Sequence, residues 1–183
     1  MTAQNLFPAI RSIIEWYIKG NSCGVKLNEN GLISCPSSGF TWMDRMDSGK
    51  RCFQPVEIQA LWYNALCEAA ELAEMFGRAA LAKTYRTLAG RAKDSFNRLF
   101  WTNGQKLNRG KTPGYLCDAI TDDGKKMITL RPNQLFALSL PFPILEENDS
   151  KWNSVLDAVK EYLVTPYGIR TLAPFEADYK PVY

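Results

Sequence analysis

Residues 55–76, PVEIQALWYNALCEAAELAEMF, and residues 78–100, RAALAKTYRTLAGRAKDSFNRLF, decide the fold class of this chain. In the first stretch, apolar side chains recur at three- and four-residue intervals from Ile58 to Ala73, with glutamates on the other side. The second stretch repeats this pattern with basic residues outward, and Gly77 breaks the helical pattern between them. The sequence therefore predicts two long helices joined by a tight turn as an antiparallel hairpin.

Three further helices are predicted outside this hairpin because they show the same apolar periodicity. They cover residues 6–18, 131–140 and 150–163. Between the first helix and the hairpin, residues 21–55 are rich in Gly, Ser, Asn and Pro, which predicts a long loop with a short strand pair, Val25–Leu27 and Leu32–Ser34. The chain is thus predicted to be one all-α domain of helical hairpins over residues 1–183, with long loops that build a site at one end.

Composition excludes several classes of function. With 22 basic and 19 acidic residues the net charge is +3, so a nucleic-acid partner is not expected. No run of 18 apolar residues and no signal peptide is present, and the chain is therefore not expected to enter a membrane. Five cysteines without a C-x-x-C pair indicate ordinary thiols in a reduced, cytoplasmic compartment.

The sequence contains no histidine. Serine and cysteine catalytic arrangements that depend on histidine, and the usual histidine-containing metal sites, are excluded together. Any acid–base chemistry then falls to carboxylates, and no metal or organic cofactor is expected.

The loop Thr41-Trp42-Met43-Asp44 carries the most suggestive carboxylate. Apolar neighbours would raise the pKa of Asp44, as a general acid requires, whereas Arg45 would lower it, so the direction of the shift stays open. The alternative is that Trp42 and Met43 plug the core under a long loop and Asp44 is a cap or an ion-pair partner.

Other candidate site residues lie on the first hairpin helix and in two loop-to-helix junctions. Glu57 could contact a substrate or simply stabilise the first turn of its helix. The junctions 130–134 and 165–172 combine polar donors with aromatic rings, which suits a hydroxyl-rich ligand but could equally satisfy loop backbone. The candidates for pocket walls and sugar contacts are Trp42, Glu57, Trp62, Tyr63, Asn64, Arg131, Asn133, Gln134, Tyr167 and Arg170.

Four blocks of this sequence, in this order, resemble the amylo-α-1,6-glucosidase domain of glycogen debranching enzymes. The blocks are residues 41–44 (TWMD), 55–66 (PVEIQALWYNAL), 130–141 (LRPNQLFALSLP) and 165–172 (TPYGIRTL). The resemblance extends from about residue 31 to residue 183 and implies part of an (α/α)6 toroid, in which paired helices form two concentric rings. It also implies inverting hydrolysis of α-1,6-linked glucose at branch points of glycogen or maltodextrin, with Asp44 as the general acid.

The chain also departs from the family pattern. An inverting glycosidase needs a second carboxylate as a base, which this family carries in segments with a His-x-Gly-Thr-Val-Trp-Pro-like motif that the sequence lacks. About five helices are predicted here, whereas the closed ring has twelve. We therefore expect the chain to be inactive alone and to self-associate, to pair with a separately encoded remainder of the ring, or to close into a compact bundle.

Two other interpretations remain open. A non-catalytic carbohydrate-binding or scaffold protein could have kept this part of the fold after losing the base. An unrelated helical adaptor for protein partners would need no pocket chemistry.

Overall fold

The long helical hairpin predicted from the sequence is present and is the largest unit of the fold. In a computed structural model that describes residues 3–37, 39–43, 53–108, 110–145 and 150–181, it consists of α2 (Val56–Met75) and α3 (Ala79–Leu99). Gly77 adopts φ +70°, and the N–H of Arg78 donates to the carbonyl of Ala73 across the turn. This left-handed turn ends α2 and reverses the chain, because glycine adopts positive φ without a side-chain clash.

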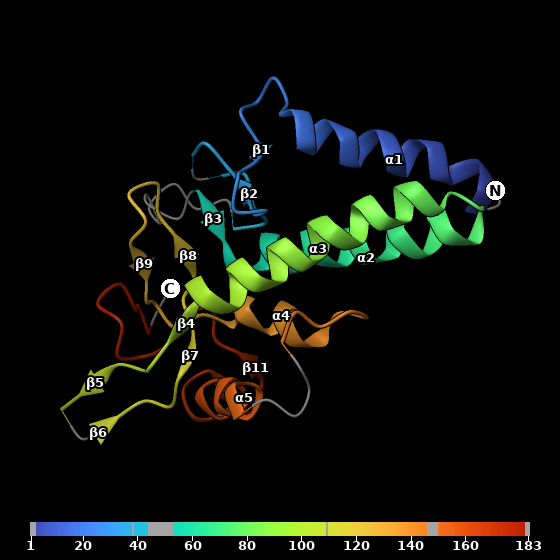
Figure 1. The fold of residues 1–183 in the computed structure, drawn as a ribbon. Helices are drawn as coiled ribbons and strands as arrows, with labels where there is room; N and C mark the ends of the chain where they lie inside the picture. Colours follow the sequence, from blue (N-terminus) through green and yellow to red (C-terminus); the bar gives the residue numbers. More distant parts are fainter. Residues whose placement is uncertain (1–2, 38, 44–52, 109, 146–149, 182–183) are drawn as a thin grey trace.

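The first helix, α1 (Ala3–Lys19), lies along this hairpin and completes a layer of three helices (Figure 1). Two aromatic pairs hold it at its two ends. The rings of Phe7 and Phe76 are 5.4 Å apart, and those of Tyr17 and Trp62 are 6.0 Å apart. Such tilted pairs add to the burial of apolar area that drives the packing.

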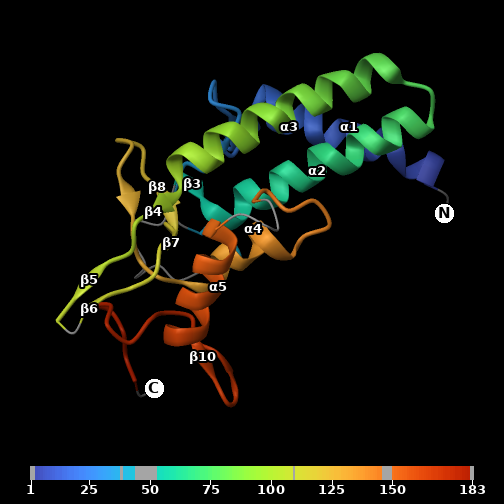
Figure 2. The ribbon, with the colours of Figure 1, turned by 60° about the horizontal axis from the view of Figure 1, so that its bottom comes forward.

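The described part of the chain also holds eleven strands of two residues each, so the expectation of an all-α fold is only partly confirmed. Most of these strands lie beyond one end of the helical layer, the end far from the N-terminus (Figures 1 and 2). They are β1 (Lys26–Leu27), β2 (Ile33–Ser34), β3 (Gln54–Pro55), β4 (Trp101–Thr102), β5 (Lys106–Leu107), β6 (Gly110–Lys111), β7 (Tyr115–Leu116), β8 (Ala119–Ile120), β9 (Lys126–Met127), β10 (Val164–Thr165) and β11 (Gly168–Ile169).

The strands form five small antiparallel sheets that pin the loops. β3, β8 and β9 make one three-stranded sheet, and the other pairs are β1 with β2, β4 with β7, β5 with β6 and β10 with β11. The predicted strand pair in the first long loop is confirmed by β1 and β2. Gln59 of α2 reaches across to Ile33 of β2, where its amide accepts from the backbone N–H at 2.8 Å and donates to the carbonyl at 2.9 Å. The loop is thereby fixed to the hairpin.

The helix predicted over residues 131–140 is a 3-10 turn, η2 (Pro132–Leu135), followed by the short α4 (Phe136–Ser139). Pro132 suits a first helical position because its missing N–H would have no partner there. The last helix, α5 (Ser150–Tyr162), agrees with the prediction and packs on a second small core that includes Leu130 and Tyr115. Figure 2 shows α5 on the side of α4 away from the long hairpin.

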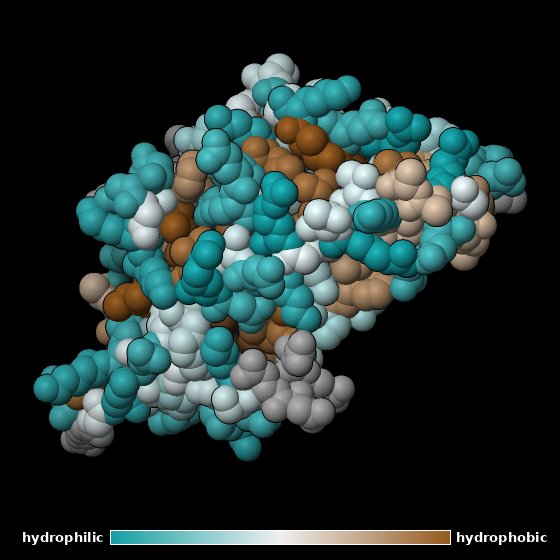
Figure 3. All heavy atoms as spheres, viewed as in Figure 1, coloured by the Kyte–Doolittle hydropathy of each residue, from teal (hydrophilic) through white to brown (hydrophobic). Residues whose placement is uncertain are grey.

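Apolar side chains remain exposed on the outer surface of α1. Leu6, Ile13 and Trp16 are 42%, 56% and 56% exposed and lie on one stripe of the helix. Figure 3 shows apolar atoms reaching the surface over the helical layer, among polar ones. Among the described residues, none of the helices combines the length and the apolar character needed to cross a membrane.

Candidate functional site

Asp118 lies between β7 and β8, where loops from several parts of the chain meet. Only 2% of its surface is exposed. Its backbone carbonyl accepts a hydrogen bond from the N–H of Val56 at 3.0 Å, and its N–H donates to the carbonyl of Met127 at 2.8 Å. The backbone of Asp118 therefore connects the first residue of α2 to the three-stranded sheet.

The carboxylate of Asp118 contacts two residues at the start of η2. The Nε of Arg131 lies 3.5 Å from its Oδ2, and the Nδ2 of Asn133 donates to its Oδ1 at 3.1 Å. Arg131 is mostly buried and Asn133 is 1% exposed. A buried carboxylate is stable only with such partners, because removing it from water is costly.

Two more loops join this cluster through the same side chains. The Nδ2 of Asn133 lies 3.0 Å from the Sδ of Met43, next to the candidate acid in the sequence. The Nη1 of Arg131 donates to the backbone carbonyl of Thr171 at 3.1 Å. Residues from all four blocks thus contact Asp118, Arg131 or Asn133, and we call these three residues the Asp118 cluster.

Two other predicted site residues lie beside this cluster. Gln134 accepts from the N–H of Leu116 at 3.0 Å and donates to the carbonyl of Arg131 at 2.9 Å, which fixes η2 against β7. Glu57, in the first turn of α2, is only 1% exposed. Its burial distinguishes it from a solvent-facing carboxylate that merely complements the helix dipole.

Three predicted sugar contacts on α2 have other partners in the structure. The Nε1 of Trp62 donates to the carbonyl of Gly31 at 3.2 Å, and Trp62 belongs to the main core. Tyr63 lies under the ammonium of Lys93, and Asn64 is hydrogen-bonded to the backbone of Phe142. The role of these three side chains in sugar binding stays a prediction.

The remaining predicted residues lie at the edge of the loops or outside the described residues. Tyr167, between β10 and β11, is 99% exposed, and Arg170 is half-buried. Trp42 is 59% exposed, so it does not plug the core, as the alternative interpretation required. Asp44, the predicted acid, lies outside the described residues, and its role stays a prediction.

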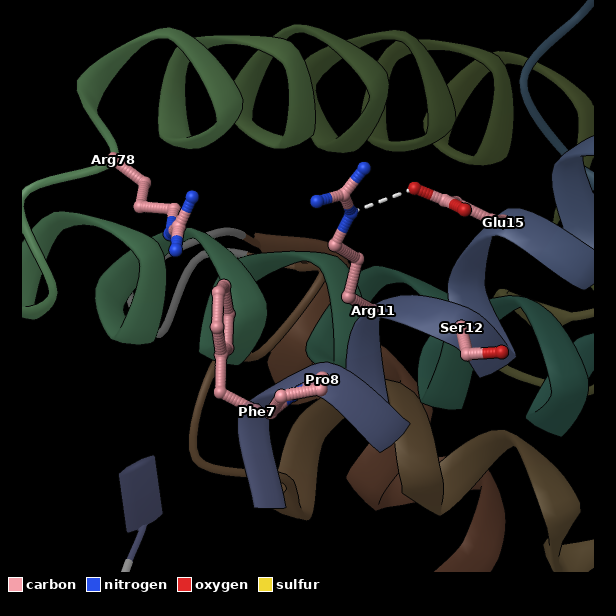
Figure 4. A pocket seen from close by; sticks show the side chains of 6 residues that line it. All are labelled: Phe7, Pro8, Arg11, Ser12, Glu15 and Arg78. Carbon is pink, nitrogen blue, oxygen red and sulfur yellow. Dashed lines mark hydrogen bonds and ion pairs between the residues drawn. The ribbon is translucent and has the colours of Figure 1, made fainter. Parts of the chain in front are cut away.

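A shallow pocket of about 280 Å³ lies between α1 and the turn of the long hairpin, away from the Asp118 cluster (Figure 4). It is lined by Phe7, Pro8, Arg11, Ser12, Glu15 and Arg78. The Nε of Arg11 donates to Glu15 at 2.7 Å, and this ion pair raises the pKa of Arg11, whose guanidinium is therefore already neutralised within α1. None of the described residues of the four blocks lines this pocket.

The sequence interpretation did not single out Asp118. Its only local signal is a carboxylate at the end of a short extended segment between turns, which is weak evidence. Within the described ranges, no three His, Cys, Asp or Glu side chains come close enough to hold a metal ion. The Asp118 cluster consists of three hydrogen-bonding groups, a carboxylate, a guanidinium and an amide.

Solved structures of other proteins share the fold of this chain. The chain is similar to a bacterial glucoamylase complexed with acarbose (TM-score 0.59, 16% identity), covering 90% of this chain and 24% of that one. It is also similar to a rhamnosidase of family GH78 from Bacillus sp. GL1 (TM-score 0.62, 15% identity), covering 92% of this chain and 16% of that one. The fold is thus a helical-hairpin fold of the glycoside hydrolase type, and the chain spans less than a quarter of the length of these neighbours.

The family follows from the sequence profile. The profile described as amylo-alpha-1,6-glucosidase matches residues 1–183, including the first thirty residues, outside the four blocks. The chain belongs to the amylo-alpha-1,6-glucosidase family. A search of curated proteins finds no match to it.

Proposed function

We propose that this chain is the glucan-binding and acid-bearing part of an amylo-α-1,6-glucosidase domain, which acts on α-1,6-linked glucose at branch points of glycogen or maltodextrin. One observation supports this proposal most strongly. The four family blocks, up to 130 residues apart in the chain, make contacts with one buried cluster at Asp118. Family membership suggests the reaction class, and the cluster supplies polar groups that could bond a sugar.

The ligand chemistry agrees with the proposal. A glucosyl residue presents several hydroxyl groups, each of which must find a donor or an acceptor when it leaves water. The Asp118 cluster offers a carboxylate with a guanidinium 3.5 Å from one of its oxygens and an amide 3.1 Å from the other. Trp42, exposed beside Met43, could cover the C–H face of a sugar ring.

In the proposed reaction, Asp44 protonates the departing glycosidic oxygen. A base on the other side of the sugar activates water, at about 6.5–9.5 Å from the acid in inverting enzymes. No residue of this chain is assigned to that base. We therefore expect the 183-residue chain to bind α-glucan, and we expect turnover only where another segment supplies the second carboxylate.

The test compares binding and turnover in the same preparation. Affinity for maltooligosaccharides is measured by calorimetry, and glucose release is measured on a branched limit dextrin. Any glucose release should fall at least about a hundredfold in Asp44→Asn, because the substituted amide cannot deliver a proton. Asp47→Asn, a carboxylate of the same loop outside the Trp-Met-Asp block, is the matched control and should retain the parent rate.

The outcomes separate the open interpretations. Release that Asp44→Asn abolishes and Asp47→Asn preserves would support an enzyme with Asp44 as its acid. Binding without release, with or without other segments of the domain, would favour the non-catalytic carbohydrate-binding protein. Undiminished release by Asp44→Asn would show that the acid is another residue, and absence of both binding and release would contradict the proposal.

A further inference from the structure

The side-chain amide of Asn133 is held in one orientation by its neighbours. Its Nδ2 faces two acceptors, the Oδ1 of Asp118 at 3.1 Å and the Sδ of Met43 at 3.0 Å. A carboxylate that is ionised accepts hydrogen bonds and donates none, so rotating the amide by 180° would place oxygen against oxygen. Asp118 therefore fixes the orientation of the Asn133 amide, with the Nδ2 towards the carboxylate and the Oδ1 away from it.

This orientation leaves an unusual atom. The Oδ1 of Asn133 is buried and has no hydrogen-bond partner in the part of the chain that the structure describes. Most buried polar atoms in proteins are paired, and each exception requires an explanation. Stability alone would favour an arrangement in which both ends of this amide are used, as they are in Gln59 and Gln134 nearby.

The other end of the same carboxylate restrains Arg131. Its Nε lies 3.5 Å from Asp118, while its Nη1 is held by the carbonyl of Thr171. A guanidinium anchored at two points has lost much of its rotamer freedom before any ligand arrives. One buried carboxylate thus orients a donor group and an acceptor group that come from the same turn, η2.

Building on the proposed function, we propose that Asp118 is a positioning residue for glucan binding. Its carboxylate holds the amide of Asn133 so that the Oδ1 accepts a hydrogen bond from a glucosyl hydroxyl, and it holds Arg131 beside that position. Asp118 acts through these two side chains and does not itself touch the sugar. The ligand class is a neutral hydroxyl-bearing α-glucan, because an amide oxygen accepts a hydrogen bond from a neutral hydroxyl group.

The test is a double-mutant cycle on the full chain with maltopentaose as the probe. Asp118→Asn replaces the carboxylate with an amide that can donate or accept, so the orientation of Asn133 is no longer imposed. Asn133→Ala removes the acceptor itself. We expect each variant to weaken maltopentaose binding about tenfold, and the double variant to bind no more than about twofold more weakly than Asn133→Ala.

Two controls separate positioning from a purely structural role. Asp123→Asn makes the same substitution in the exposed turn between β8 and β9 and should bind maltopentaose like the parent chain. Unfolding of every variant is followed in urea, and binding is measured where each variant is fully folded. A carboxylate with only a structural role would shift the unfolding midpoint in Asp118→Asn and leave the affinity of the folded protein unchanged.

The possible results are distinct. Parent affinity in folded Asp118→Asn, or full additivity in the double variant, would overturn the positioning role and leave the proposed function standing. A parent chain that does not bind maltopentaose would instead overturn the proposed function. If Asp118→Asn does not fold, Asn133→Ala decides alone, because unchanged affinity after loss of the Oδ1 would overturn the inference.

Discussion

The side-chain amide of Asn64 in α2 is hydrogen-bonded on both sides to the backbone of Phe142, 78 residues later. Its Nδ2 donates to the carbonyl of Phe142, and its Oδ1 accepts from the N–H at 3.2 Å. Phe142 stands between Pro141 and Pro143, which have no N–H groups, so this segment cannot pair as an ordinary strand. The side chain of Asn64 therefore provides the hydrogen bonds for the backbone of the Pro-Phe-Pro segment after α4.

Replacing Asn64 with alanine should destabilise the fold by about 2 kcal/mol, because two hydrogen bonds are lost and the backbone of Phe142 is left without them. Urea unfolding measures this change, as a lower midpoint with an unchanged slope. Maltopentaose affinity of the folded variant should equal that of the parent. A variant of parent stability that has lost affinity would instead show that Asn64 is a sugar contact, as the family block suggested.

Two glycines with the same backbone angle give a matched pair. Gly104 and Gly124 both have φ +79°, so alanine at either site carries the same cost of a left-handed residue, about 1–2 kcal/mol. At Gly104 a Cβ would lie 2.2 Å from the carbonyl oxygen of Thr112, whereas at Gly124 it would meet nothing within 4 Å. Gly104→Ala should therefore cost at least about 2 kcal/mol more than Gly124→Ala.

Thermal or urea unfolding of both variants measures that difference. Equal losses would mean that the β4 to β5 turn, which contains Gly104, can move away from Thr112 without cost. The comparison tests the packing of the loop end independently of any ligand, because neither glycine belongs to the Asp118 cluster.

The helical part of the fold could be predicted because its signals are local. The apolar spacing in α2 and α3 and the break at Gly77 are contained within a few turns of helix, and the structure reproduces them closely. The two-residue strands could not be predicted in the same way, since alternation over two residues is no signal. Their pairing depends on contacts between distant parts of the chain. In the pair of β3 with β8, for example, the paired residues are about 65 positions apart.

The site was predictable only in part. Arg131 and Asn133 stood out because they lie in a family block, but their shared partner Asp118 did not, because its role depends on contacts that the chain makes 13 and 15 residues later. The amides of Gln59 and Asn64 likewise bond to the backbone of residues distant in the sequence, Ile33 and Phe142. Residue type indicates what a side chain can bond, and only the tertiary structure decides which partner it meets.

The thiol of Cys117 should be unreactive in the folded protein. Burial raises its pKa from the model-peptide value of 9.0 to about 12, so the thiolate fraction at pH 8 is about a thousandfold lower. Cys23, in contrast, is exposed. Iodoacetamide at pH 8 should modify Cys23 rapidly and Cys117 only after unfolding, as measured by peptide mass spectrometry.

The same shift predicts how stability depends on pH. A thiol whose pKa is raised in the folded state stays protonated there, while the unfolded chain releases its proton above about pH 9. The contribution of Cys117 is therefore fully present below pH 9 and declines as the pH rises from 9 towards 12. Cys117→Ser should flatten this decline, and an unchanged slope in alkaline urea titrations would contradict the assigned burial effect.

The exposed apolar stripe on α1 should mediate association. Leu6, Ile13 and Trp16 lie within about 80° of each other around the helix and are each at least 42% exposed, which is typical of a helix face that packs against another hairpin. We expect the parent chain to self-associate with rising concentration and the Ile13→Glu/Trp16→Glu double variant to remain monomeric.

Gln4→Glu, about 180° around the helix from Ile13, is the control and should associate like the parent. Light scattering after size-exclusion chromatography measures all three, and a parent chain that stays monomeric throughout would show that the stripe does not bind a second copy.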